Sequence, residues 1–311
     1  MTSTAWTANT RLRGVFAAGL TLLNEDLSID AEATIGHTRW LLSHGCDGVL
    51  IFGTTGEANS FTVDERLGLI DAIGRSDLPR NRLMIGTGCC AIPDTIALTK
   101  RALAIGVHGA LLLPPFYYKN VSDDGLFAAL AQTIDKIADP RLRAYLYHFP
   151  QLTGVPYTHA VIERLLKAYP STVTGIKDSS GDFANMKAMA QRFQGFDVFS
   201  GNEEFLLDVM RVGGVGTISA TCNVTCEATQ RVYSNWKSAE AESLQATLSA
   251  QRKAFTGIAV PPACKAILVR HGGRKTWLTV RPPFTRAQPE AVDALMARLQ
   301  AASFALPALA A

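Results

Sequence analysis

Short apolar runs alternate with segments of helical periodicity from about residue 13 to residue 220 of the chain. Residues 48–52, Gly-Val-Leu-Ile-Phe, form a continuous apolar run of the kind found in fully buried strands. In residues 29–43, by contrast, Ala33, Trp40 and Leu41 recur at the i, i+7, i+8 spacing of one helix face. The same alternation predicts eight strands, at residues 14–20, 48–52, 83–87, 109–113, 143–147, 173–177, 197–200 and 215–219.

The order of these elements predicts the fold class. Eight short apolar strands, each followed by a helix, are typical of a closed parallel (β/α)8 barrel, the TIM barrel. An open doubly wound sheet is the alternative, but no Gly-x-Gly-x-x-Gly sequence opens a helix after the first strand. We therefore expect residues 1–224 to form an α/β barrel that carries the active site.

The last part of the chain has helical patterns only. Helices expected at residues 224–236, 238–258, 263–270 and 289–299 predict a C-terminal helical domain, residues 225–311, packed on the barrel. The alanine-rich end, residues 301–311, is expected to fray.

Polar side chains follow several of the predicted strands at the point where each strand ends. In barrels of this type chemistry takes place at the carboxyl ends of the strands, so these side chains should converge in space. They include an amine, phenols and hydroxyls, but no basic, glycine-rich phosphate cradle. The residues are Thr54, Thr55, Glu57, Tyr117, Tyr118, Tyr147, His148, Lys177, Asn202, Glu203, Glu204 and Ser219.

Lys177 is the candidate nucleophile. It ends the β-branched run 172–176, and the polar turn 178–181 follows before a helical pattern begins at Phe183. An apolar strand behind a lysine can hold its amine neutral, and a neutral amine attacks a ketone to form a Schiff base. A lone lysine after a strand is more often an ordinary surface residue, so the other strand ends must support this interpretation.

Composition and charge exclude several classes of protein. Apolar residues make up 48% of the 311 residues, and a net charge of +3 without clustering argues against nucleic-acid binding. No apolar run reaches the length of a membrane span, and residues 1–13 lack the apolar region of a secretory signal, so we expect a cytoplasmic protein. No histidine stands at metal-ligand spacing from the cysteines, and the cysteines are scattered along the chain, so the sequence predicts neither a zinc site nor a disulfide framework. The six cysteines are Cys46, Cys89, Cys90, Cys222, Cys226 and Cys264.

Seven motifs carry a resemblance to a known family. Over about residues 12–225 the chain is similar to the class I pyruvate-dependent aldolases of the dihydrodipicolinate synthase / N-acetylneuraminate lyase superfamily. The motifs follow one another in the same order as in that family. Each motif alone is weak, and their joint order is specific. They lie at residues 53–57 (Gly-Thr-Thr-Gly-Glu), 86–88, 115–119, 147–150 (Tyr-His-Phe-Pro), 175–178 (Gly-Ile-Lys-Asp), 200–204 and 213–219.

The resemblance implies a role for each matching residue. Lys177 would form the Schiff base with the keto carbon of pyruvate or another 2-keto acid, with no metal and no separate cofactor. Tyr147 would act as general acid/base, in a proton relay with Thr54 and with Tyr118, which in this family comes from a neighbouring subunit. The resemblance therefore implies a homo-oligomer, a dimer or a tetramer. The residues expected to bind substrate are Gly53, Thr54, Thr55, Glu203, Glu204, Ile218 and Ser219.

The chain departs from the family's pattern at positions that concern the substrate. Dihydrodipicolinate synthases hold the aldehyde's carboxylate with an arginine at the position of Leu152, and a leucine holds an anionic aldehyde poorly. Glu203 and Glu204 resemble the acidic pair with which sialic acid lyases bind sugar hydroxyls, although Ala220 stands where those lyases have a serine. His148 replaces an asparagine, and a structural role for it is favoured.

Three functions remain open at this point. The leading hypothesis is a Schiff-base lyase, aldolase or dehydratase, that acts on a 2-keto-3-deoxy sugar acid or a similar 2-keto acid. The second is synthesis of 4-hydroxy-tetrahydrodipicolinate, in lysine biosynthesis. The third is a barrel that binds a keto acid without turnover. The sequence leaves open the aldehyde half of the substrate, the stereochemistry and the choice between dimer and tetramer.

Overall fold

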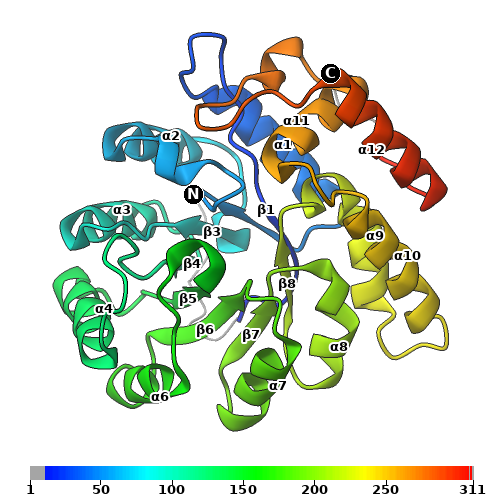
Figure 1. Ribbon diagram of the computed structural model, residues 1–311. Coiled ribbons are helices and arrows are strands. Elements are labelled where there is room, and N and C mark those ends of the chain that lie inside the picture. Colours follow the sequence, from blue (N-terminus) through cyan, green and yellow to red (C-terminus); the bar gives the residue numbers. More distant parts are fainter. Residues whose placement is uncertain (1–10, 308, 310–311) are drawn as a thin grey trace.

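Eight parallel strands close into a barrel in the computed structural model, which describes residues 11–307 and 309 (Figure 1). Each strand pairs with the next along the chain, and β8 pairs with β1 to close the ring. The predicted (β/α)8 fold with C-terminal helices is confirmed. The strands are β1 Gly14–Ala18, β2 Gly48–Ile51, β3 Leu83–Gly86, β4 Gly109–Leu112, β5 Ala144–His148, β6 Val173–Asp178, β7 Asp197–Ser200 and β8 Gly216–Ser219.

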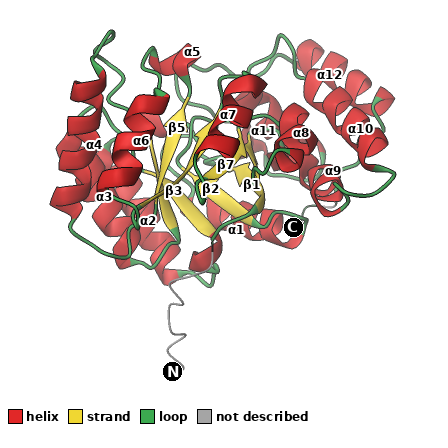
Figure 2. Ribbon diagram, turned by 90° about the horizontal axis from the view of Figure 1, so that it is seen from below, coloured by secondary structure: helices red, strands yellow, loops and turns green. Residues whose placement is uncertain are grey.

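The strands are buried on both faces, which explains why they read as unbroken apolar runs. In β4, Leu111 faces the barrel interior together with Phe16, Tyr145 and Phe199. Its neighbours Ala110 and Leu112 pack against the surrounding helices instead. Figure 2 shows the strands inside and the helices around them. Because side chains alternate along a strand, both faces need apolar residues when both are covered.

The helices between the strands begin where capping residues stand. Thr62 and Glu65 form a capping box at the start of α2 (Val63–Arg75). Ser122, Thr158 and Asp182 cap α4 (Asp123–Ile137), α6 (His159–Ala168) and α7 (Phe183–Arg192). The expected helix 203–212 is split into a 3-10 turn, η3 Glu203–Phe205, and α8 Leu206–Arg211. The other helices are α1 Ala31–Ser43, α2 Val63–Arg75, α3 Ile92–Ala104, α4 Asp123–Ile137, α5 Pro150–Thr153, α6 His159–Ala168 and α7 Phe183–Arg192.

Four further helices lie together on one side of the barrel, beside α1 and α8 in Figure 1. They are α9 Cys222–Ser234, α10 Ala241–Lys253, α11 Val260–Arg270 and α12 Pro289–Ala301. The boundary expected between residues 224 and 225 falls inside the first turn of α9.

The expected fraying of the alanine-rich end is wrong for its described apolar residues. Phe304, Leu306 and Leu309 pack against the core that the C-terminal helices share with α1 and with the loop after β1. The remaining residues of that prediction, 308, 310 and 311, and most of the segment 1–13 used for the secretory prediction, lie outside the described residues. Within residues 11–307 and 309, no helix is both long and apolar enough to cross a membrane.

Candidate active site

Lys177 and Tyr147 lie side by side at the carboxyl ends of two neighbouring strands. They are register partners in the parallel pair β5–β6, so their side chains leave the sheet at the same level. Lys177 Nζ lies 3.3 Å from the phenolic oxygen of Tyr147 and 4.4 Å from the centre of its ring. Both side chains are buried, at 3% exposure each. An amine and a phenol are thus held in contact away from bulk water.

Thr54 adds a third polar group from the loop after β2. Its Oγ1 lies 3.3 Å from the same oxygen of Tyr147. The Tyr147 hydroxyl therefore joins Thr54 to Lys177 in one line of hydrogen-bonding groups. Gly53, Thr54 and Tyr147 line a common cavity at the mouth of the barrel, and Thr55 is buried beside them. We call Lys177, Tyr147 and Thr54 the Lys177 group.

The loop that carries Thr54 and Thr55 is fixed by Glu57, which ends its Gly-Thr-Thr-Gly-Glu sequence. Glu57 has left-handed backbone angles with φ 54°, a conformation that costs energy for a residue with a side chain. Its carboxylate is fully buried and accepts from Lys265 Nζ at 2.6 Å and from the Arg281 backbone N–H at 2.9 Å. The Thr21 hydroxyl also donates to the backbone oxygen of Gly56 at 2.7 Å.

Lys265 was not among the site residues expected from the sequence. It lies on α11 in the C-terminal helical region, 208 residues from Glu57, and is fully buried. Burial lowers the pKa of this lysine, and the nearby Glu57 carboxylate opposes that shift. The one signal in the sequence is a lysine amid the apolar residues of α11, Val-Pro-Pro-Ala-Cys-Lys-Ala-Ile-Leu-Val-Arg.

Asp178 fixes the turn that follows Lys177. Its buried carboxylate accepts from the Ser180 backbone N–H and from Asn185 Nδ2, both at 2.8 Å. Its backbone oxygen accepts from the Gly201 N–H at 2.6 Å, which joins the turn to the loop after β7. Lys177 therefore stands on a backbone whose next residue is held at three points.

His148 has the structural role that we expected. The backbone N–H of Tyr157 donates to His148 Nδ1 at 3.1 Å, so this nitrogen acts as an acceptor. Burial lowers the pKa of the imidazole, although Asp178 and Asp182 oppose the shift. The histidine links the end of β5 to the start of the segment before α6.

Tyr117 and Tyr118 do not join the Lys177 group within the chain. They follow β4 and are 72% and 74% exposed, with their rings edge to face at 5.2 Å. Lys119 holds their loop by donating to the backbone oxygens of Phe116 and Thr153. A large phenol pair exposed to this degree is available to a second molecule.

Glu203 and Ser219 differ from their expected role as substrate ligands. Glu203 is fully buried, and its carboxylate accepts from the hydroxyls of Ser219 and Thr221, with Arg252 Nε at 3.7 Å. The two residues thus hold η3 against β8 and the C-terminal helices, and the Glu203 carboxylate is closed to solvent in the free chain. The physical reason is the 3-10 turn η3, which Asn202 caps by accepting from the Glu204 N–H and in which Glu203 is the buried residue.

Two other residues expected to bind substrate, Glu204 and Ile218, and the exposed Leu152 lie in different surroundings. Glu204 is half-buried, and its carboxylate lies 3.7 Å from Lys253 Nζ. Ile218 belongs to the apolar cluster inside the barrel that also contains Tyr147. Leu152 lies on the short helix α5 and is 60% exposed. In the described part of the chain, no group of three or more His, Cys, Asp or Glu residues is placed to hold a metal ion.

The arrangement supplies the parts of amine-based covalent catalysis. An amine is the nucleophile, and a phenol in contact with it can transfer protons to and from a reacting oxygen. Threonine hydroxyls nearby suit the carboxylate of a small acid. These groups come from the loop after β2 and from the ends of β5 and β6, the edge of the barrel where catalytic residues are found.

Comparisons with known proteins agree with this geometry. The family model described as "Dihydrodipicolinate synthetase family" matches residues 11–302. An uncharacterized DapA-like lyase of Chloroflexus aurantiacus is 36% identical over 261 residues, 82% of this chain and 86% of the relative.

Two solved structures have the same fold over almost the whole chain. Dihydrodipicolinate synthase from Agrobacterium tumefaciens is 30% identical, with a TM-score of 0.86 over 93% of this chain and 99% of the other. YagE, a prophage protein of the dihydrodipicolinic acid synthase family from E. coli K12 solved with pyruvate, is 25% identical, with a TM-score of 0.84 over 95% and 100%. The chain therefore belongs to the dihydrodipicolinate synthetase family and is a class I lyase.

Proposed function

We propose that the protein forms a covalent imine between Lys177 and the keto carbon of a 2-keto acid such as pyruvate. The observation that carries the proposal is the 3.3 Å contact between Lys177 Nζ and the Tyr147 hydroxyl at the barrel mouth. The amine adds to the ketone, and the carbinolamine then loses water to give the imine. The pyruvate bound to the relative from E. coli supports this choice of substrate. The chemistry needs no metal and no separate cofactor.

The proton transfers fall to the hydroxyl groups around Lys177. Tyr147 delivers the proton that lets water leave the carbinolamine, and Thr54 passes protons to and from Tyr147 across their 3.3 Å contact. Gly53, Thr54 and Thr55 bind the carboxylate of the keto acid through hydroxyls and backbone N–H groups. Ile218 packs against the methyl or methylene carbon.

The protonated imine then acidifies the carbon next to it. A base, in our proposal the Tyr147 phenolate, removes the proton of the hydroxyl group on the next carbon but one, and that carbon becomes the carbonyl of an aldehyde. The C–C bond between this carbon and the carbon next to the imine breaks, and its electron pair passes to the nitrogen to give an enamine. Alternatively, a hydroxyl group leaves as water after the proton is removed from the carbon next to the imine. The first route is an aldolase reaction and the second a dehydratase reaction, and both use the same Lys177 group.

For the rest of the substrate we propose an uncharged, hydroxylated chain, as in a 2-keto-3-deoxy sugar acid. Leu152 offers no cation to a second carboxylate, and half-buried Glu204 can accept hydrogen bonds from sugar hydroxyls. Synthesis of 4-hydroxy-tetrahydrodipicolinate from pyruvate and aspartate semialdehyde is the second candidate, which the 30% identity to the synthase from Agrobacterium tumefaciens favours.

Release of pyruvate from a panel of 2-keto-3-deoxy acids tests the substrate. We expect turnover of at least one panel member that Lys177→Ala abolishes, and a rate with aspartate semialdehyde near background. The variant Leu152→Arg should raise kcat/KM for the semialdehyde, since it adds a cation at an exposed position. Efficient wild-type synthesis from the semialdehyde would reverse the order of the two candidates. If Lys177→Ala kept keto-acid affinity and any biological output, a non-catalytic binding barrel would be favoured instead.

We also propose a homo-oligomer, at least a dimer, in which Tyr118 of one copy completes the relay of the other. The exposed Tyr117–Tyr118 pair supports this assembly, because a second copy would cover it. The substrate is a small metabolite, and we place the protein in the cytoplasm, without a nucleic-acid or membrane partner.

A further inference from the structure

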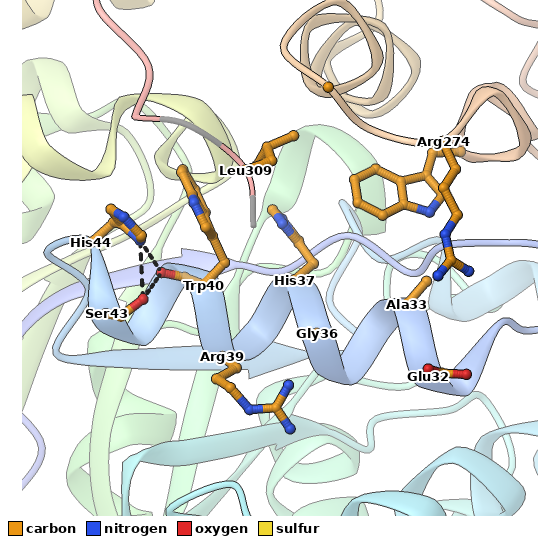
Figure 3. A pocket seen from close by; sticks show the side chains of 12 residues that line it. Glu32, Ala33, Gly36, His37, Arg39, Trp40, Ser43, His44, Arg274 and Leu309 are labelled. Atoms are coloured by element: carbon orange, nitrogen blue, oxygen red, sulfur yellow. Dashed lines mark hydrogen bonds between the residues drawn. The ribbon is translucent and has the colours of Figure 1, made fainter. Parts of the chain in front are cut away.

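A cavity of about 340 Å³ lies between α1 and the segment that follows α11 (Figure 3). None of its lining residues belongs to the Lys177 group. Its volume is in the range of sites that hold small ligands. The lining residues are Glu32, Ala33, Gly36, His37, Arg39, Trp40, Ser43, His44, Gly272, Arg274, Trp277 and Leu309.

Flat rings form the walls of the cavity. On one face of α1, His37 stacks with Trp40 at 6.0 Å and an interplanar angle of 12°, and Trp40 stacks with His44 at 4.6 Å and 23°. In Figure 3 these side chains rise on the same side of the helix, toward Leu309. Trp277 comes from the 3-10 turn η4 Lys275–Leu278 and adds an indole from the other side. Such walls favour a planar ligand.

Two buried polar atoms at the cavity have no partner among the described residues. The amide oxygen of Asn223 accepts from His37 Nε2 at 2.9 Å, so Nε2 carries the hydrogen and Nδ1 is an acceptor. His37 is 3% exposed and its Nδ1 makes no hydrogen bond within residues 11–307 and 309, nor does the Nε1–H of Trp277. Burial also lowers the pKa of His37 to about 4, which keeps Nδ1 an acceptor at neutral pH. Unsatisfied buried groups of this kind indicate a missing partner.

A cation stands at one end of the cavity. Arg274 is exposed and makes no ion pair within the described chain, whereas Arg39 is bound to Asp77 at 2.5 Å and points away from the rings. Glu32 lines the same end as Arg274, and its negative charge opposes the binding of a second carboxylate there.

We propose that this cavity binds a small planar aromatic or heteroaromatic acid with one carboxylate and one O–H or N–H donor. The ring lies between Trp277 and the His37–Trp40 wall. Both His37 Nδ1 and Trp277 Nε1 are closed to solvent in the free chain, so the two rings shift on binding. The ligand's donor then bonds to His37 Nδ1, and its carboxylate accepts from Arg274 and from Trp277 Nε1. The proposal does not depend on the proposed function, because binding is measured without a keto acid.

Titration of the full chain with 4-hydroxybenzoate and with indole-3-carboxylate tests the proposal, by calorimetry and by fluorescence of Trp40 and Trp277. We expect saturable binding of at least one probe with one site per chain. Cyclohexanecarboxylate, which has the charge without the flat ring, should bind at least about tenfold more weakly. Absence of saturable binding for both aromatic probes would overturn the proposal.

Glycine variants give a matched control. An added Cβ at Gly36, inside the cavity, and at Gly68, on the exposed face of α2, meets no atom within 4 Å. Gly36→Leu should fill the cavity and abolish binding, whereas Gly68→Leu should leave it unchanged. Binding that survives Gly36→Leu places the probe elsewhere and overturns the proposal.

Two variants at exposed residues test the same site if Gly36→Leu fails to fold. Arg274→Gln should weaken binding about tenfold, and Lys275→Gln, at the neighbouring exposed cation, should not. Equal affinity of the two variants would contradict the assigned role of Arg274.

Discussion

Lys265 Nζ lies 2.6 Å from Glu57 Oε1, and neither side chain is exposed to solvent. Lys265 also donates to the backbone oxygen of Thr279 at 2.9 Å. This pair connects the loop of Thr54 and Thr55 to the C-terminal helices across 208 residues. The helical region therefore fixes the geometry of the candidate carboxylate-binding loop from behind.

Lys265→Met should strongly destabilise the fold. Removal of the ammonium leaves the buried carboxylate of Glu57 without its cation, and loss of one partner of a buried pair costs about 3–5 kcal/mol. Chemical unfolding of the variant measures the cost. The double variant Lys265→Met/Glu57→Gln should recover part of it, because a neutral amide can still accept from the Arg281 N–H. If the loss of stability in the double variant equalled the sum of the losses in the two single variants, a direct coupling between the two side chains would be contradicted.

Tyr147→Phe should lower kcat by about 10²–10⁴-fold while substrate is still bound, since general acid/base groups contribute on this scale. Tyr145→Phe is the matched control. Tyr145 lies two residues earlier on β5, and its buried hydroxyl has no hydrogen-bond partner within the described residues. The control should keep full activity. Equal rates for the two variants would show that the Tyr147 hydroxyl has no part in the chemistry.

His37 should make the free energy of unfolding depend on pH. Burial lowers its pKa to about 4, against about 6.5 in an unfolded chain. Between these values the folded state binds fewer protons than the unfolded state, so stability falls as the pH drops from about 6.5 to about 4. The contribution is about 3 kcal/mol. His37→Gln keeps a donor for Asn223 and should show a smaller loss of stability over this window, by denaturant titration at several pH values. An unchanged slope would contradict the assignment.

Mixed oligomers test whether two copies share a site. Lys177→Ala and Tyr118→Phe should each be nearly inactive alone. If Tyr118 of one copy acts on the neighbour's Lys177, a dimer of the two different variants has one intact site and one doubly defective site. Random re-association of equal amounts makes half of all dimers of this mixed kind. Re-association of equal amounts should then restore about a quarter of the wild-type activity. A mixture that stays inactive although mixed dimers form would rule out the shared relay.

The sequence predicted the barrel because its strands are buried on two faces and are separated by helices with recognisable caps. The run 109–113 is apolar throughout since Leu111 faces inward while Ala110 and Leu112 face the helices. The helix expected at 203–212 was less well predicted. Asn202 accepts from the Glu204 N–H at 3.0 Å and starts a 3-10 turn that buries Glu203, and a local pattern does not specify such a change of direction.

The sequence also predicted that Thr54, Tyr147 and Lys177 lie together, since all three follow or end parallel strands of one barrel. It could not predict contacts between distant segments. Lys265 meets Glu57 across 208 residues, and His37 meets Asn223 across 186. No spacing rule connects such residues, because their contact depends on how the C-terminal helices dock on the barrel.

Borohydride reduction in the presence of pyruvate tests the central claim most directly. Reduction converts an imine into a stable secondary amine, so peptide mass spectrometry should find one reduced pyruvate per chain, on Lys177. The Lys177→Ala variant should gain no mass under the same conditions. A wild-type chain of unchanged mass, or a modification at another lysine, would contradict the account.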